Sequence, residues 1–156
     1  MSIIPMTIKG FQKLQDEVRQ LKSVERPKII DAIASARSLG DLSENAEYHA
    51  AKERQGLVES RIAELEDKIS KASVIDAAKI ESDTVKFGAT VRIRDENGAD
   101  SEFQIVGSDE ADIRNGFLPV TSPIAKSLIG KACGEALEVK TPGGVKRYCI
   151  LEIRYI

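Results

Sequence analysis

The run from residue 48 to residue 72 restricts the fold of this 156-residue chain more than any other segment. Its seam positions alternate between spacings of three and four residues, at Tyr48, Ala51, Gln55, Val58, Ile62, Leu65, Ile69 and Ala72. This alternation is typical of an α-helix that packs along its length against another helix, as in a coiled coil. The run therefore predicts one long helix with a single coiled-coil seam.

A second seam lies upstream of the first. Phe11, Leu14, Val18 and Leu21 follow the same spacing, and they come after Thr7, a residue type that favours the N-cap position. The register breaks at Pro27, because proline removes a backbone donor and bends helices, and it resumes through Ile29, Ile30, Ile33 and Ala36. The short connection between the two patterns predicts antiparallel helices, each roughly 40 Å long.

The hydrophobic period changes to two near residue 84. Five segments alternate like strands, at residues 85–87, 90–94, 103–106, 137–140 and 148–153. Turn signals occupy residues 95–98 and 141–144, and a short helix is predicted with Ser122 as cap, Pro123 at its first position and Gly130 as its stop. We predict an α+β fold with an antiparallel coiled-coil hairpin (1–76), a linker (77–83) and a small antiparallel sheet with one short helix (84–156).

Composition limits the range of functions. The 23 basic and 25 acidic side chains give a net charge of −2, without the basic excess of a general nucleic-acid binder. Aromatic residues make up 4% of the chain and Trp is absent, so platforms for stacking single-stranded bases are scarce. Two cysteines fit a reducing compartment. Because we find neither a leader pattern nor a run of about 20 apolar residues, we expect a cytoplasmic location and no membrane partner.

The bend between the two helices is acidic and admits two interpretations. In the structural one, Gly40 ends the first helix in a left-handed conformation, while Asp41 and Glu44 form a capping box on the second helix. In the functional one, the same two carboxylates point past the end of the rod. Two carboxylates bind Mg²⁺ only together with waters and ligands from elsewhere, so the ion would be shared with a partner's active site, where a second metal promotes phosphodiester cleavage.

The remaining candidate residues are less informative. His49 is the one histidine, and a lone exposed histidine on a helix usually has no catalytic role. No set of Cys and His has zinc-site spacing. The first helix is locally basic, which fits either a solvated face or a surface that follows a nucleic-acid backbone; its basic residues are Lys9, Lys13, Arg19, Lys22, Arg26, Lys28 and Arg37.

With these motifs in this order, the chain resembles the bacterial Gre family, the transcript cleavage factors of RNA polymerase, and most closely its GreA type. The tip motif Gly40-Asp41-Leu42-Ser43-Glu44-Asn45-Ala46-Glu47-Tyr48 carries the most specific part of the resemblance. Further matching segments are residues 5–7, 26–27, 36–37, 74–76, 87–88, 105–107, 110–112, 122–124 and 130–131. The resemblance covers essentially the whole chain.

The resemblance implies a role for each part of the molecule. In Gre factors the hairpin enters the secondary channel of the polymerase, and its tip acids help to place a second Mg²⁺ for cleavage of backtracked RNA. Asp41 and Glu44 would thus be the metal-assisting pair, acting in the polymerase active centre. The other implied roles are tip shaping by Gly40, Leu42, Ser43, Asn45 and Tyr48, RNA-facing charge at Arg37 and Lys52, and polymerase docking at Asp112, Ser122 and Pro123.

The resemblance also implies the partners. The second half would be an FKBP-like docking domain, and the chain would bind a bacterial RNA polymerase elongation complex near the 3′ end of the nascent RNA; proximity to DNA through that complex is left open. No cofactor would be bound by the chain alone, and the Mg²⁺ would be shared with the polymerase. The chain would stimulate the endonuclease activity of the polymerase without being an enzyme itself.

Three alternatives stay open at this point. A Gre-like antagonist would occupy the channel without promoting cleavage, but we expect a different acid pattern at its tip. An FKBP-type peptidyl-prolyl isomerase is disfavoured by the 4% aromatic content, which supplies few side chains to line a proline pocket. A coiled-coil chaperone or scaffold is expected to carry apolar rather than acidic hairpin tips.

Overall fold

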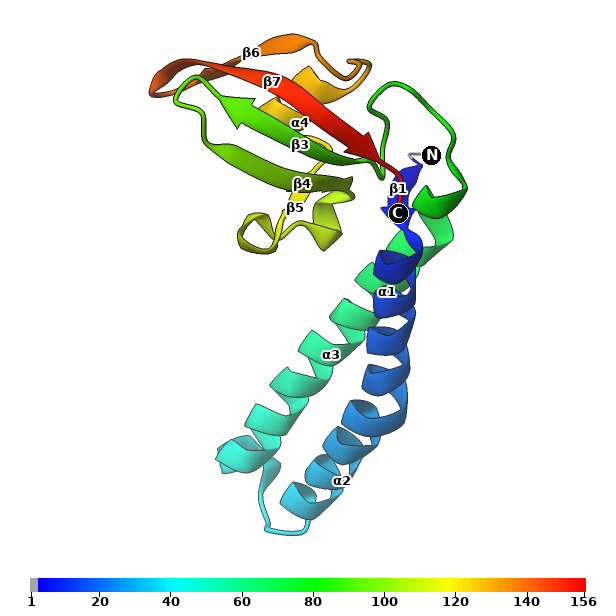
Figure 1. The fold of residues 1–156 in the computed structure, drawn as a ribbon. Helices are drawn as coiled ribbons and strands as arrows, with labels where there is room; N and C mark the ends of the chain where they lie inside the picture. Colours follow the sequence, from blue (N-terminus) through cyan, green and yellow to red (C-terminus); the bar gives the residue numbers. More distant parts are fainter. Residues whose placement is uncertain (1–2) are drawn as a thin grey trace. The chain divides into compact units, whose positions relative to one another are not determined.

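The structure, a computed structural model, describes residues 3–156. Contacts divide them into two compact units (Figure 1). One unit comprises Phe11–Ala72, and the other combines Ile3–Gly10 with Ser73–Ile156. The sequence predicted a hairpin at residues 1–76, a linker at 77–83 and a sheet domain at 84–156; the contacts group Ser73–Ile156 together with Ile3–Gly10.

The first arm of the hairpin contains one irregular turn. Helix α1 (Ile8–Gln20) continues through a π-helical turn (Leu21–Glu25) into α2 (Arg26–Arg37). Thr7 caps α1 as predicted, since its Oγ1 accepts a hydrogen bond from the Gly10 N–H at 3.1 Å. The Arg26 N–H bonds to the Leu21 carbonyl, five residues back, and Pro27 follows directly. The predicted break at Pro27 thus takes the form of a π turn, a known cause of bending.

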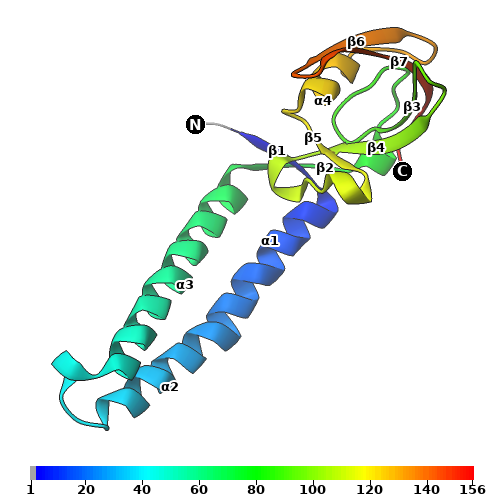
Figure 2. The ribbon, with the colours of Figure 1, turned by 90° about the vertical axis from the view of Figure 1, so that its left-hand side faces the viewer.

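The second arm is the single helix α3 (Ala46–Lys71) of 26 residues, which lies beside α2 in Figure 2. The predicted seam is its buried face, with Ala51, Ile62 and Leu65 buried on α3 and Ile29 and Ala36 on α2. Towards the tip the buried seam side chains are alanines, whereas Ile29, Ile62 and Leu65 fill it farther back. The half of the hairpin next to the tip therefore buries less apolar surface.

Ion pairs cross between the two arms. Arg26 pairs with Glu59 and Glu17 with Arg61, both at 2.7 Å, and Lys22 pairs with Glu66 at 2.9 Å. Early residues of one arm meet late residues of the other, as antiparallel packing requires. These side chains are at least a third exposed, so each pair contributes at most about 1 kcal/mol. They also neutralise part of the basic face noted on the first helix.

The C-terminal unit contains a curled five-stranded sheet (Figures 1 and 2). Its strands are β3 (Thr90–Asp95), β4 (Asp100–Val106), β5 (Phe117–Pro119), β6 (Ala136–Thr141) and β7 (Gly144–Arg154), in the order β5-β4-β3-β7-β6. Four of the five predicted strands are present. The predicted short helix is α4 (Pro123–Leu128), whose Ser122 cap accepts a hydrogen bond from the Ala125 N–H at 3.1 Å.

Two expectations about strands were wrong, and one small sheet was missed. The sheet is not wholly antiparallel, because β5 pairs in parallel with β4. Residues 85–87 form no strand; Val85 is fully buried, so the apolar pattern there reflects core packing rather than a ladder. A small two-stranded sheet of β1 (Ile4–Thr7) and β2 (Ala72–Ile75) was not predicted, because each strand directly adjoins a long helix and Ala72 continues the helical seam pattern.

The core of the C-terminal unit is aliphatic, as the composition suggested. Buried side chains from the sheet, from α4 and from the segment before β3 form one cluster: Val85, Ala89, Val91, Ile93, Ile105, Leu118, Ala125, Leu128, Leu137, Val139 and Ile150. Helix α4 packs against β6. Within residues 3–156, no helix is both long enough and apolar enough to cross a membrane.

Candidate functional site at the hairpin tip

The chain reverses direction between α2 and α3 through a tightly bonded loop. Helix α2 ends at Arg37 with Ser38 as its C-cap, and Gly40 has a positive φ of 127°, as predicted for a residue that ends a helix. The predicted capping box was wrong. Asp41 caps a separate 3-10 turn, Leu42–Glu44, and helix α3 begins only at Ala46, with Asn45 as its N-cap.

Asp41 is held as a carboxylate at this turn. Its Oδ1 accepts a hydrogen bond from the Ser43 N–H at 3.0 Å and another from the Ser43 hydroxyl at 2.9 Å. The pKa of Asp41 is lowered, chiefly by the backbone N–H of Ser43 and then by the Ser43 hydroxyl, because both bonds favour the charged form. Both bonds use Oδ1, so Oδ2 remains available to a further partner.

Asn45 joins the two arms at the tip. Its Oδ1 accepts a hydrogen bond from the Tyr48 N–H at 3.0 Å, which caps α3. Its Nδ2 donates to the Ala36 carbonyl at 2.6 Å, which satisfies a carbonyl in the last turn of α2. One amide side chain therefore bonds to both helix ends. These two bonds are consistent with the tip-shaping role that the resemblance implied for Asn45, which stays a prediction.

Two further residues lie at the tip, and of these only Leu39 was not considered from the sequence. His49, on the first turn of α3, has its Nε2 3.3 Å from the Ser43 carbonyl, and its ring stands edge-on to that of Tyr48 with centroids 5.6 Å apart. Leu39 is an exposed apolar side chain beside the bend. The contact of His49 with the Ser43 carbonyl was not predicted, because it depends on the shape of the loop before α3. No sequence pattern predicted that Leu39 would be exposed.

The two acids predicted to assist a metal ion lie at one turn. Asp41 and Glu44 are both exposed; Asp41 caps the 3-10 turn and Glu44 is its last residue. Within residues 3–156, no three His, Cys, Asp or Glu side chains gather as a metal site. Carboxylate oxygens are the ligands that Mg²⁺ prefers, commonly one or two from the protein. The tip thus presents two exposed carboxylates, and their binding of such an ion stays a prediction.

The predicted RNA-facing residues lie on separate helices close to the tip. Arg37 is the last residue of α2 and is exposed. Lys52 is exposed on α3, where its Nζ donates a hydrogen bond to Gln55 Oε1 at 3.1 Å. Along the chain, Arg37 precedes Asp41 by four positions and Lys52 follows Glu44 by eight. Their role towards RNA stays a prediction.

The three predicted docking residues flank strand β5 in the C-terminal unit. Asp112 exchanges two backbone hydrogen bonds with Phe117, both at 2.9 Å, at the start of the strand. Ser122 lies just beyond its end and caps α4, with Pro123 exposed at the first helical position. Beside Asp112 the structure exposes two large apolar side chains, Ile113 and Phe117, which the sequence analysis had not singled out.

Comparison with known proteins identifies the family. The family model described as "Transcription elongation factor, N-terminal" matches residues 4–74, and the model described as "Transcription elongation factor, GreA/GreB, C-term" matches residues 80–155. The chain belongs to the GreA/GreB family of transcription elongation factors. The resemblance stated from the motifs is confirmed.

Individual proteins with similar sequences support the same family assignment. It is 55% identical to the transcription elongation factor GreA of Caulobacter vibrioides over the full length of both chains, and 55% identical to that of Phenylobacterium zucineum, again with complete coverage. The GreA of Maricaulis maris is 53% identical over 99% of each chain. Each of these proteins is named a transcription elongation factor.

Solved structures of similar proteins are more distant. GreA factor homolog 1 of Thermus thermophilus is 22% identical, with a TM-score of 0.44 over 97% of this chain and 99% of that one. A GreA/GreB factor from Nitrosomonas europaea is 21% identical, with a TM-score of 0.43 and the same coverage. The family assignment rests on the sequence matches alone.

Proposed function

We propose that this GreA/GreB family chain binds bacterial RNA polymerase and stimulates Mg²⁺-dependent cleavage of backtracked nascent RNA. The observation that carries the proposal is the pair of exposed carboxylates, Asp41 and Glu44, at the end of a long helical hairpin. A hairpin of this length can deliver the two acids into a channel that a compact domain cannot enter. In this proposal the channel is the secondary channel of the polymerase.

The tip residues have distinct roles in the proposed reaction. When bound between the tip and the polymerase, a second Mg²⁺ would activate water and stabilise the leaving oxygen of the cleaved phosphodiester. Asp41 and Glu44 would hold that ion. Ser43 donates two hydrogen bonds to Asp41 Oδ1, which hold the carboxylate in place and lower its pKa. Asn45 fixes the turn that carries both acids by bonding to the two helix ends.

The chain acts as a stimulator rather than an enzyme in this proposal. Two exposed carboxylates bind Mg²⁺ weakly by themselves, because the ion gives up its waters reluctantly. Beside the acids of a polymerase and an RNA phosphate, the same carboxylates would meet a partly dehydrated, preorganised site in which electrostatic effects are larger. The polymerase would therefore perform the cleavage, at a location next to the 3′ end of the nascent RNA.

The C-terminal unit supplies the docking surface in the proposed complex. We assign docking to an FKBP-like domain with Asp112, Ser122 and Pro123 on its surface. The exposed apolar side chains of Ile113 and Phe117 next to Asp112 support this assignment, because apolar and aromatic residues favour the centres of interfaces. The proposal divides the labour between a unit that binds and a tip that assists the chemistry.

A cleavage assay on a purified, backtracked bacterial elongation complex tests the proposal. We expect the wild-type chain to release short 3′ RNA fragments, and Asp41→Asn to lose this stimulation while binding the polymerase with unchanged affinity. Asp31→Asn, which changes an exposed aspartate on α2, is the matched control and should cleave like wild type. Binding without cleavage by the wild-type chain would instead identify an antagonist, and equal loss of binding and cleavage in Asp41→Asn would refute the division of labour.

A further inference from the structure

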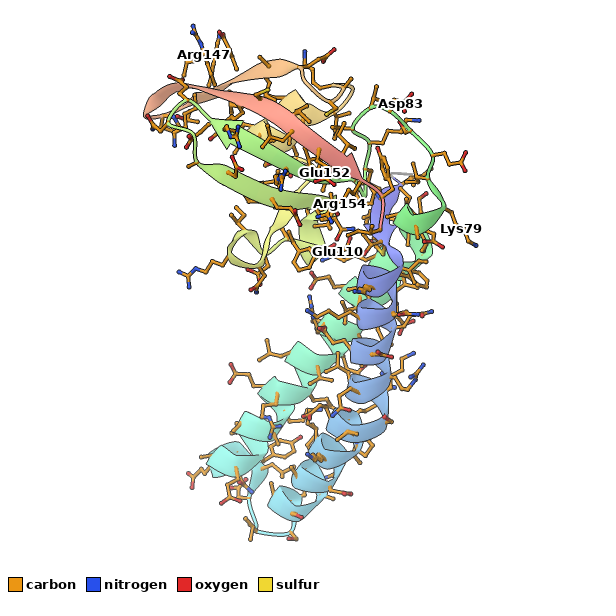
Figure 3. All side chains as sticks on the ribbon, in the orientation of Figure 1. Lys79, Asp83, Glu110, Arg147, Glu152 and Arg154 are labelled. Atoms are coloured by element: carbon orange, nitrogen blue, oxygen red, sulfur yellow. The ribbon has the colours of Figure 1, made fainter. Side chains whose placement is uncertain are left out.

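One side chain of α3 reaches back to the turn that carries the two tip acids. The turn between α2 and α3, drawn with its side chains in Figure 3, lies entirely within the hairpin unit Phe11–Ala72. His49, on the first turn of α3, has its Nε2 3.3 Å from the Ser43 carbonyl oxygen. Because a carbonyl oxygen only accepts hydrogen bonds, Nε2 carries the hydrogen in this contact and donates it. His49 therefore bonds to the 3-10 turn from the helix that follows it.

Ser43 connects the two tip acids. Its N–H and its hydroxyl donate to Asp41 Oδ1 at 3.0 and 2.9 Å, and its carbonyl accepts the hydrogen bond from His49. That carbonyl belongs to the planar peptide group that joins Ser43 to Glu44. Because this group is rigid, a bond that fixes the direction of the carbonyl also fixes the direction of the Glu44 N–H. Two bonds of Ser43 thus hold Asp41, and the third orients Glu44.

The start of α3 holds His49 in place for this bond. The His49 N–H donates to the Asn45 carbonyl at 3.1 Å, and Asn45 also caps the helix through the Tyr48 N–H at 3.0 Å. The ring of the half-buried Tyr48 stands edge-on to the imidazole, with ring planes at 66°, an arrangement that aromatic pairs favour. The backbone and the ring of His49 are therefore both supported, although its side chain is exposed.

The position of the Glu44 carboxylate depends on the backbone more than that of Asp41 does. Within residues 3–156, no group donates a hydrogen bond to the Glu44 carboxylate, whereas the Asp41 carboxylate accepts two. The bond that closes the 3-10 turn, from the Asn45 N–H to the Leu42 carbonyl, is long at 3.4 Å. The turn therefore needs a further bond to keep one orientation at Glu44, and the bond from His49 supplies it.

We propose that His49 is a positioning residue: by donating from Nε2 to the Ser43 carbonyl, it orients the peptide group that carries Glu44, and so presents Glu44 together with Asp41 to the shared Mg²⁺. The inference rests on the proposed function and concerns only the tip of the hairpin unit. His49 touches neither RNA nor metal in this account. Its effect is on the rate of cleavage by a bound factor rather than on the affinity for the polymerase.

Three substitutions of His49 separate the hydrogen bond from the ring. His49→Gln loses the ring but keeps an N–H donor about as far from the backbone as Nε2, whereas His49→Asn carries the same amide on a shorter side chain that cannot reach. His49→Phe keeps an aromatic ring beside Tyr48 without a donor. Glu53→Ala, at another exposed side chain of α3, is the matched control.

Two quantities are measured for each protein. The first is the cleavage rate of a backtracked elongation complex against factor concentration, which separates the saturating rate from binding. The second is the carbon-13 chemical shift of the Ser43 carbonyl in the free protein, which reports the hydrogen bond without any cleavage.

We expect His49→Asn and His49→Phe to lower the rate at saturating factor about threefold to tenfold, the range that the loss of one hydrogen bond gives. The half-saturating concentration should stay unchanged, and the Ser43 carbonyl resonance should move to lower frequency. His49→Gln should restore both the rate and the chemical shift, and Glu53→Ala should match wild type.

Wild-type saturating rates in His49→Asn and His49→Phe would overturn the inference, as would equal losses in His49→Gln and His49→Asn. Failure of the wild-type chain to stimulate cleavage would overturn the proposed function, and this inference with it. The Ser43 carbonyl shift distinguishes the two failures, because in the second case it would still show the bond from His49.

Discussion

Replacing Asn45 by alanine should loosen the hairpin tip without unfolding the hairpin. The substitution removes the N-cap of α3, at Tyr48 N–H, and the hydrogen bond to the Ala36 carbonyl, at 3.0 and 2.6 Å respectively. Apolar packing near the tip cannot make up for the two lost hydrogen bonds, because the buried seam side chains nearest to the tip are the small side chains of Ala36 and Ala51. The effect is therefore expected to be concentrated at the ends of α2 and α3.

The size of the effect follows from the two lost bonds. Loss of an N-cap side chain costs about 1 kcal/mol, and a further side-chain hydrogen bond contributes about 1 kcal/mol. Together they predict a loss of about 2 kcal/mol in the free energy of local opening. Because each 1.4 kcal/mol is a factor of ten, amides in the first turn of α3 should exchange with solvent roughly thirtyfold faster.

Native-state hydrogen exchange followed by NMR measures this directly, since it reports local opening amide by amide. Asn45→Asp is the control, because it keeps the oxygen that caps Tyr48 but removes the donor to the Ala36 carbonyl, so it should recover about half of the lost protection. Amides around the buried Leu65 should be unchanged in both variants. If Asn45→Ala left exchange at Tyr48 and His49 as in wild type, the assignment of Asn45 as the link between the two arms would be wrong.

Two other predictions concern the hairpin and its tip. Leu65→Ala removes a fully buried seam side chain and should lower the free energy of unfolding by about 2 to 5 kcal/mol. The control Leu57→Ala changes an exposed side chain and should alter that free energy by less than about 0.5 kcal/mol. Urea unfolding followed by circular dichroism measures both, and an equal loss in the two variants would contradict the predicted seam. The lowered pKa of Asp41 means that its stabilising bonds to Ser43 are fully present above its ordinary pKa of 3.8 and are lost as the pH falls through the lowered value. A carbon-13 NMR titration should place the Asp41 midpoint below 3.8 and Ser43→Ala should raise it, whereas an ordinary midpoint in the wild-type chain would contradict the bonds.

Much of the fold was accessible from pattern alone. The 3–4 seam predicted the helices because burial imposes that period along their whole length, and Thr7 and Ser122 cap their helices as their residue types suggested. The long strands of the sheet alternate clearly for the same reason. Residues 85–87 were wrongly predicted to form a strand, because the core buries Val85 outside any strand. Strand β5 was missed because its sequence, Phe117-Leu118-Pro119, is apolar throughout and does not alternate.

The sequence predicted which residues form the candidate site but not which hydrogen bonds they make. The tip motif identified Asp41 and Glu44 as candidates, yet the bend contains two residues able to cap, Asp41 and Asn45. Local propensity could not decide between them. The structure uses both, Asp41 for the 3-10 turn and Asn45 for α3, because only Asn45 can also donate to the carbonyl of Ala36.

The most direct test of the central claim is the Mg²⁺ dependence of cleavage in a backtracked elongation complex. The rate is measured across a range of Mg²⁺ concentrations without factor, with the wild-type chain and with Asp41→Asn, at factor concentrations that saturate binding. If the tip carboxylates share the ion, the wild-type chain should lower the Mg²⁺ concentration for half-maximal cleavage, and Asp41→Asn should leave it near the factor-free value. An equal lowering by Asp41→Asn would show that Asp41 is not a ligand and that the tip acts in another way.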